Sequence, residues 1–135
     1  AGWLCLALAA WLRDGPVRQR LLLAGGRVVP LLLCAAYAAL LLANRGQAPD
    51  GGFGSLAAVQ ALFAPPGKML GAWTHFLAFD LLVGRWVVDD ALRPGRSRAV
   101  LLVGLPGVFG FGPLGLLLVL AAQAVLSRPP GRPAG

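Results

Sequence analysis

The sequence contains no glutamate and no isoleucine, and it has only one lysine and one histidine. Charged residues make up 13% of its 135 positions, about half of their share in an ordinary soluble domain, whereas 58% of the residues are hydrophobic. A small soluble domain has a large surface for its volume and would need more polar residues to cover that surface. The composition therefore excludes an ordinary cytosolic domain and a disordered chain, and it indicates that the protein lies in a lipid bilayer.

The signatures of disulfide, metal and nucleotide sites are also missing. Cys5 and Cys34 lie in separate apolar runs without CxxC spacing, and we interpret them as small hydrophobic residues. The chain has no P-loop, HExxH or GxSxG motif. The glycines between positions 104 and 115, which include the string GFGPLG at 110–115, do not follow a strand as a nucleotide-binding loop would. We therefore expect no metal site, and the sequence identifies no cofactor.

The net charge of +7 is distributed between the apolar blocks. This is how membrane proteins flank their spans, whereas a nucleic-acid-binding domain gathers its cations on one face, so we expect no nucleic-acid partner. Loop 13–27 carries four arginines and loop 89–98 carries three, against Arg45 and Lys68 in the middle connection. The excess predicts that loops 13–27 and 89–98 are cytoplasmic, and the Gly-, Ala- and Arg-rich composition favours a bacterial cytoplasmic membrane.

Four apolar blocks predict an all-α fold, an integral membrane bundle of about four transmembrane helices. The expected spans are 1–12, 28–43, 70–88 and 99–126. They form a single multi-pass membrane domain over 1–127, followed by a polar tail over 128–135. The first block would cover about 18 Å, less than the hydrocarbon core of roughly 30 Å, and we expect a truncated span there. The last block is overlong at about 42 Å, and its prolines and glycines predict a kink.

The connection between the second and third blocks holds a short apolar segment. Ser55 is a suitable N-cap for a helix over 56–63, and Pro65 and Pro66 end that helix. Because Gln60 is its only polar side chain, we expect this helix to lie at the membrane interface.

The third block carries ionisable residues at depth. Asp80 lies near its midpoint, where insertion costs about 2.5–3.5 kcal/mol. Arg85 lies nearer the cytoplasmic end and can pair with Asp89 one turn later. On a helical wheel His75 and Asp80 are about 140° apart, so partners from other blocks must complete any shared site. The candidates are Tyr37 and the backbone around Gly112–Pro113.

Two interpretations of these residues stay open. In one, Asp80 makes an interhelical hydrogen bond, Arg85 anchors a helix end and His75 is structural. In the other, Asp80 or His75 handles a proton or binds a polar ligand group. Tryptophans such as Trp73 and Trp86 are explained by an interface belt or by packing, with ligand contact as the alternative.

Three strings carry a resemblance to a known family. They are DGGFGSL at 50–56, HFLAFDLLVGRW at 75–86 and FGPLGLLL at 111–118. Their order and spacing resemble the signature blocks of a membrane family that is typified by the plant abscisic-acid-deficient protein needed for neoxanthin synthesis, with many bacterial relatives. The resemblance implies a small multi-pass protein of about four helices that is linked to carotenoid biosynthesis. The plant substrate is not transferred, because most bacteria make no neoxanthin.

The resemblance also implies candidate site residues. As catalytic candidates we name Asp80, as the acid that would polarise an epoxide oxygen, and His75, as the base. The resemblance points to Arg85, Trp86, Gly112, Pro113 and Gly115 as candidate ligand-binding residues. Tyr37 and Trp73 are added as candidates from their positions in the apolar blocks.

Three functions remain open at the level of sequence, and it stays undecided whether the protein is an enzyme. The first is a membrane protein that binds or modifies a carotenoid or another isoprenoid lipid. The second is a non-catalytic scaffold or partner subunit, associated with a pathway enzyme or with further copies of itself. The third is a small transporter subunit that uses the broken last helix; the absence of an internal repeat argues against it.

Overall fold

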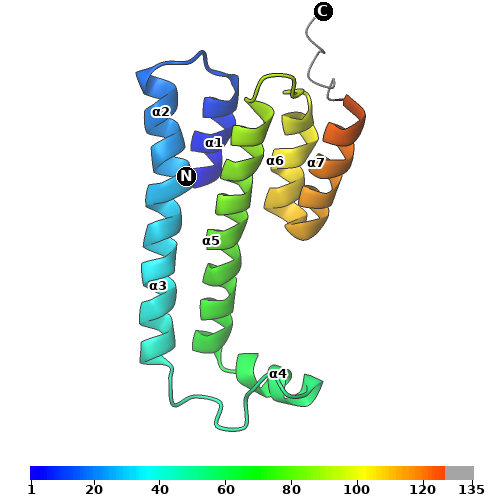
Figure 1. Ribbon diagram of the computed structural model, residues 1–135. Coiled ribbons are helices and arrows are strands. Elements are labelled where there is room, and N and C mark those ends of the chain that lie inside the picture. Colours follow the sequence, from blue (N-terminus) through cyan, green and yellow to red (C-terminus); the bar gives the residue numbers. More distant parts are fainter. Residues whose placement is uncertain (127–135) are drawn as a thin grey trace, which may run out of the picture. The chain divides into compact units, whose positions relative to one another are not determined.

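The computed structural model describes residues 1–126, and within them helices are the only regular secondary structure. The predicted all-α class is confirmed, and the tail predicted at 128–135 lies outside the described residues. The chain divides into two compact units. Figure 1 labels its helices. Unit 1 consists of residues 1–28 together with the chain from Asp80 onward, and unit 2 consists of residues 29–79.

Two long helical segments each contribute to both units. The first runs from Pro16 to Ala43 and comprises α2 (Pro16–Leu23), the π-helical turn η1 (Ala24–Val28) and α3 (Val29–Ala43). The second is α5 (Pro66–Ala91). Their 28 and 26 residues reach about 42 and 39 Å, more than the thickness of a hydrocarbon core. Among the described residues, the segment Pro16–Ala43 alone is both long and apolar enough to meet the criteria for a membrane span.

Unit 2 contains α3, the short helix α4 (Leu56–Phe63) and the first part of α5. The predicted cap of α4 is present, because the Ser55 hydroxyl accepts a hydrogen bond from the Ala58 amide at 3.1 Å. Pro66 stands at the first position of α5, where the missing N–H has no helical partner to lose. Helices are thus present where the sequence predicts an interfacial segment and a third apolar block.

Unit 1 contains α1 (Gly2–Trp11), α2, η1, the end of α5, α6 (Val100–Phe111) and α7 (Pro113–Leu126). Glycines let its helices approach closely. A Cβ on Gly84 of α5 would lie 2.6 Å from the Trp3 ring, and a Cβ on Gly25 would lie 2.6 Å from the Gly2 carbonyl oxygen. The largest fully buried side chains of the unit are Leu6, Val87, Val88, Leu101, Val108 and Val119.

The last apolar block differs from its prediction, because α6 and α7 form a hairpin instead of one kinked span. Gly107 packs against the backbone of Gly115, and Gly104 packs against Val119, so the paired positions run in opposite directions. The reversal occurs at Gly112, whose φ of +48° suits glycine, and Pro113 begins the returning helix. At 12 and 14 residues each arm reaches only about 20 Å.

The π-helical turn also has a local cause. Pro30 is the second residue after η1, and in an unbroken α-helix its ring would clash with the carbonyl of Gly26, four residues earlier. A wider turn removes that clash and lets the helix continue. The sequence AGGRV of this turn includes Gly25 and Gly26, both of which are buried.

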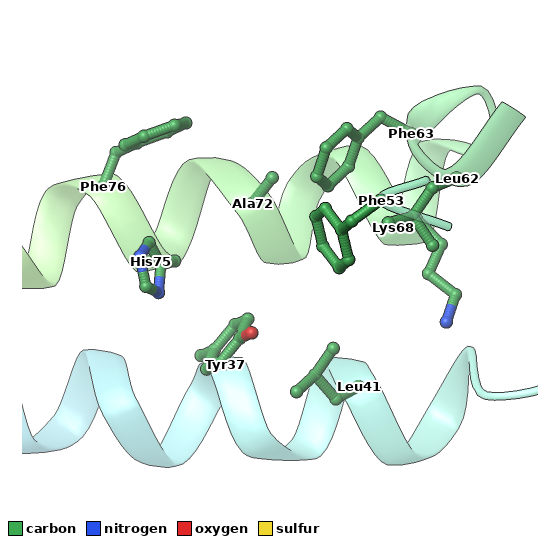
Figure 2. A pocket seen from close by; sticks show the side chains of 9 residues that line it. All are labelled: Tyr37, Leu41, Phe53, Leu62, Phe63, Lys68, Ala72, His75 and Phe76. Atoms are coloured by element: carbon green, nitrogen blue, oxygen red, sulfur yellow. The ribbon is translucent and has the colours of Figure 1, made fainter. Parts of the chain in front are cut away.

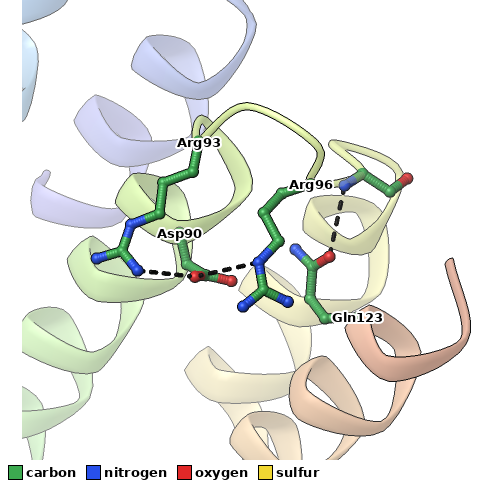
Figure 3. Close-up of polar contacts among 5 residues, drawn as sticks. Asp90, Arg93, Arg96 and Gln123 are labelled. Atoms are coloured by element: carbon green, nitrogen blue, oxygen red, sulfur yellow. Dashed lines mark hydrogen bonds and ion pairs between the residues drawn. The ribbon is translucent and has the colours of Figure 1, made fainter. Parts of the chain in front are cut away.

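A polar cluster holds the loop between α5 and α6 (Figure 3). The Asp90 side chain is only 5% exposed, and its Oδ1 lies 3.4 Å from Arg93 and 3.6 Å from Arg96. The Ser97 amide donates a hydrogen bond to Gln123 Oε1 at 3.4 Å. These contacts tie the end of α5 to the loop, and the loop to α7.

Candidate functional site

A cavity of about 370 Å³ lies within unit 2 (Figure 2). Residues from α3, the following loop, α4 and α5 contribute to it. They are Tyr37, Leu41, Phe53, Leu62, Phe63, Lys68, Ala72, His75 and Phe76. Five of these nine side chains are aromatic rings if His75 is counted, so the cavity, hereafter the aromatic pocket, suits a ligand that is mostly apolar.

His75 stands among aromatic rings inside unit 2. Its ring stacks on Phe79 with centroids 4.6 Å apart and lies 5.4 Å from the ring of Tyr37. Phe76 meets it edge-on at 5.9 Å. Among residues 1–126, none forms a hydrogen bond with the imidazole. The imidazole nitrogens therefore remain available to a polar group of a ligand.

The segment before α4 closes one side of the aromatic pocket. Gly51 packs so closely against Leu62 that a Cβ there would lie 2.6 Å from the Leu62 Cα. The Gly52 amide donates a hydrogen bond to the Ala58 carbonyl at 3.0 Å. Together with the Ser55 cap, these contacts fold the DGGFGS string onto α4. Phe53 is 82% exposed although it lines the pocket, so it forms a rim that a ligand would cover.

The C-terminal end of α3 and the N-terminal end of α5 are in contact next to the aromatic pocket. Gly67 packs directly against the side chain of Asn44, which leaves no room for a Cβ. Asn44 is itself held by a hydrogen bond from its Nδ2 to the Leu40 carbonyl at 2.8 Å. Lys68 follows Gly67 and lines the pocket, where its ammonium group is the one cationic group among the lining residues.

Asp80 has different neighbours. It belongs to unit 1, where its Oδ1 lies 3.1 Å from the position of a Cβ on Gly112. Within the described part of the chain its carboxylate forms neither a hydrogen bond nor an ion pair. Of the residues named as candidate partners, Tyr37 contacts His75, and Gly112 lies against Asp80. His75 and Asp80 belong to different units, and each has its own set of contacts.

Arg85 forms the predicted pair with Asp89. Its Nε donates to Asp89 Oδ2 at 2.7 Å, and a terminal nitrogen also donates to the Leu22 carbonyl at 2.7 Å. Trp73 and Trp86 are 62% and 41% exposed, and neither lines the aromatic pocket.

The hairpin glycines have structural roles. Gly112 makes the turn and Gly115 packs on Gly107, while Pro113 starts α7.

Sequence reasoning missed most of the pocket lining. The position of Phe79 four residues after His75 was a usable signal for a stacked pair. Phe53, Phe63 and Lys68 come from the connection and from helix ends, and no periodicity relates those positions to His75.

A second cavity of about 370 Å³ lies in unit 1, between α1 and α6. Its lining has no ionisable side chain. The residues are Trp3, Leu4, Ala7, Trp11, Leu101, Leu102, Leu105, Pro106 and Phe109. The aromatic pocket, which combines rings with His75 and Lys68, is therefore the better candidate for a specific site.

Comparison with known proteins gives a family and nothing narrower. No match was found among curated proteins or among solved structures. Residues 1–118 match the family described as ABA DEFICIENT 4-like, and this range includes all three strings that carry the resemblance, together with the whole aromatic pocket. The chain therefore belongs to the ABA DEFICIENT 4-like family.

Proposed function

We propose that this protein is a multi-pass membrane protein that binds an isoprenoid lipid of the carotenoid class, with one end group of that lipid in the aromatic pocket. The observation that carries the proposal is the pocket itself, in which aromatic side chains surround His75 and Tyr37. Its volume of about 370 Å³ lies at the lower end of the range for small-molecule sites, roughly 300–1,000 Å³. Such a pocket holds part of a long isoprenoid and leaves the rest of the chain outside.

Membrane embedding is supported by the surface of both units. Large apolar side chains are exposed on the helices, including Leu31, Leu32, Phe76, Val103 and Phe111. Soluble monomers rarely expose apolar patches on this scale, whereas lipid tails cover them without cost. The segment Pro16–Ala43 and α5 are long enough to cross the bilayer, and the hairpin arms and α1 are half-length elements that suit a re-entrant position.

The ligand class is supported by the chemistry of the lining. Flat, rigid rings and polyenes pack well against phenylalanine and tyrosine. His75 and Tyr37 add hydrogen-bonding groups for an oxygen on the end group of the ligand. Binding is favoured over acid–base catalysis because the lining of the aromatic pocket contains no carboxyl group. The acid–base scheme expected from the sequence needs an acid as well as His75 within reach of the reacting atoms.

The test is to identify lipids that copurify with the protein from a carotenoid-producing host. Ala72→Trp fills the pocket from α5, whereas Ala39→Trp adds the same ring to α3 at an exposed position outside the lining. We expect an isoprenoid lipid with the wild type and with Ala39→Trp, and at least about a tenfold reduction with Ala72→Trp. If no isoprenoid copurifies with the wild type, or if Ala72→Trp retains it fully, the proposal is wrong.

A further inference from the structure

A smaller pocket of about 240 Å³ lies in unit 1 and shares no residue with the aromatic pocket. It is lined by Gln19, Leu22, Leu23, Arg27 and Arg85. Two guanidinium groups and one amide thus meet at a single small cavity beside the π-helical turn. Such a concentration of donors is unusual in a chain in which only 13% of the residues are charged.

Arg85 is held in a fixed orientation. Its Nε donates to Asp89 and one terminal nitrogen donates to the Leu22 carbonyl, each at 2.7 Å. Its aliphatic stem lies on Gly26, where a Cβ would come within 2.7 Å of the arginine Cγ and Cδ. Because a guanidinium has five N–H donors, these two hydrogen bonds orient the group and leave donors for a ligand.

Arg27 is the uncommitted cation of the pocket. It is exposed, and among residues 1–126 its guanidinium has no hydrogen-bond or ion-pair partner. Gln19, Leu23 and Arg27 follow at intervals of four residues and so share one side of the helix. The carboxylate of Asp89 balances one of the two arginines, so the pocket carries a net positive charge.

The π-helical turn builds this arrangement. Arg27 lies within it, and Gly26 of the same turn supplies the flat surface on which Arg85 lies. π-Helical turns are rare and occur frequently at functional sites. Here Pro30 explains why the helix widens, but Pro30 does not require two adjacent glycines or an arginine in the widened turn.

We propose that this pocket binds the phosphate group of a membrane lipid, either a phospholipid with an exposed phosphate monoester or a phosphorylated isoprenoid. Two guanidinium groups match a phosphate because their planar forks donate pairs of charge-assisted hydrogen bonds. The charge of about −1.5 to −2 on a phosphate monoester more than balances the net charge of the pocket. The site is independent of the ligand that occupies the aromatic pocket.

The experiment measures binding of defined probes to the purified full-length chain in a neutral detergent by native mass spectrometry. The probes are dioleoyl phosphatidic acid, farnesyl monophosphate and inorganic phosphate. The comparison is dioleoyl phosphatidylcholine, a zwitterion without net charge whose phosphate is a diester. Arg27→Gln removes the free guanidinium. Arg20→Gln is the matched control, because Arg20 is an exposed arginine of α2 that does not line the pocket. Intact helicity by circular dichroism is required of both variants.

We expect the wild type and Arg20→Gln to bind phosphatidic acid or farnesyl monophosphate in preference to phosphatidylcholine. Loss of charge-assisted hydrogen bonds should weaken the binding to Arg27→Gln by roughly 10- to 100-fold. The preferred probe of the two identifies the source of the phosphate. Equal weakening in both variants would reveal attraction to overall charge, and unchanged binding in Arg27→Gln would place the phosphate elsewhere. Binding of inorganic phosphate that lipid probes do not displace would show that no lipid is recognised. Each of these three results overturns the proposal.

Discussion

Replacement of Gly115 by alanine should separate α6 from α7. The Cβ at this position would collide with the backbone of Gly107 and Val108, and a backbone cannot move aside as a flexible side chain can. Gly110, on the same hairpin, has no atom within 4 Å of its Cβ position. The two glycines therefore offer the same substitution in one hairpin with opposite steric consequences.

The expected magnitudes follow from this geometry. Overpacking of a tight contact costs about 1–3 kcal/mol, whereas alanine in place of an unconstrained helical glycine stabilises by roughly 0.5–1 kcal/mol. The entropy of unfolding of a chain of this size converts the free-energy loss of Gly115→Ala into a melting temperature that is lower by roughly 4 to 12 °C. Gly110→Ala should leave it unchanged or raise it.

The assay is thermal unfolding in detergent, followed by the intrinsic fluorescence of the four tryptophans. Circular dichroism in the same buffer reports whether helix content is retained. If Gly115→Ala melts at the same temperature as Gly110→Ala, then α6 and α7 are not packed through Gly107 and Gly115, and the hairpin described above is wrong.

Three further substitutions test other parts of the fold. Ser55→Ala should destabilise α4 by about 0.5–2 kcal/mol because the Ala58 amide loses its hydrogen bond to the Ser55 hydroxyl. Amide hydrogen exchange should then become faster at residues 56–59. Unchanged exchange would refute the role of the cap. Gly67→Ala should lower the melting temperature because its Cβ would meet the Asn44 side chain. In the double variant, Asn44→Ala should restore part of the lost melting temperature. If the losses of the two single variants simply add, this contact is refuted. Asp90→Asn should increase protease cleavage in the loop at 92–99, because Arg93 and Arg96 lose the negative charge with which they pair. The control Asp14→Asn, in another loop, should leave that cleavage unchanged.

Local signals in the sequence predicted much of the helical structure. Ser55 and the paired prolines marked the bounds of α4, and the four-residue spacing predicted the contact of Arg85 with Asp89. These features depend on residues within one or two helical turns of each other, so they can be predicted from short stretches of sequence. The family resemblance, carried by three separated strings, was likewise confirmed.

The reversal at Gly112 could not be distinguished from a kink by pattern alone. Glycine and proline permit both, and the choice depends on whether the arms pack on each other, which Gly107 with Gly115 makes possible. The pairing of Tyr37 with His75 and the position of Phe53 likewise arise from contacts between separate elements. The sequence therefore named His75 and Tyr37 as candidates, but it gave no signal for most of the other residues that line the aromatic pocket.

Photocrosslinking can establish whether an isoprenoid end group occupies the aromatic pocket. An isoprenoid probe with a diazirine on its end group is added to the membrane-embedded protein, and the sample is irradiated. Peptide mass spectrometry then locates the modified residues. If the end group lies in the pocket, adducts should be concentrated at residues 37–41 and 72–76, and both unlabelled carotenoid and Ala72→Trp should suppress them. Adducts spread evenly over the exposed apolar side chains of the other helices, or adducts in the pocket that unlabelled carotenoid does not suppress, would contradict it.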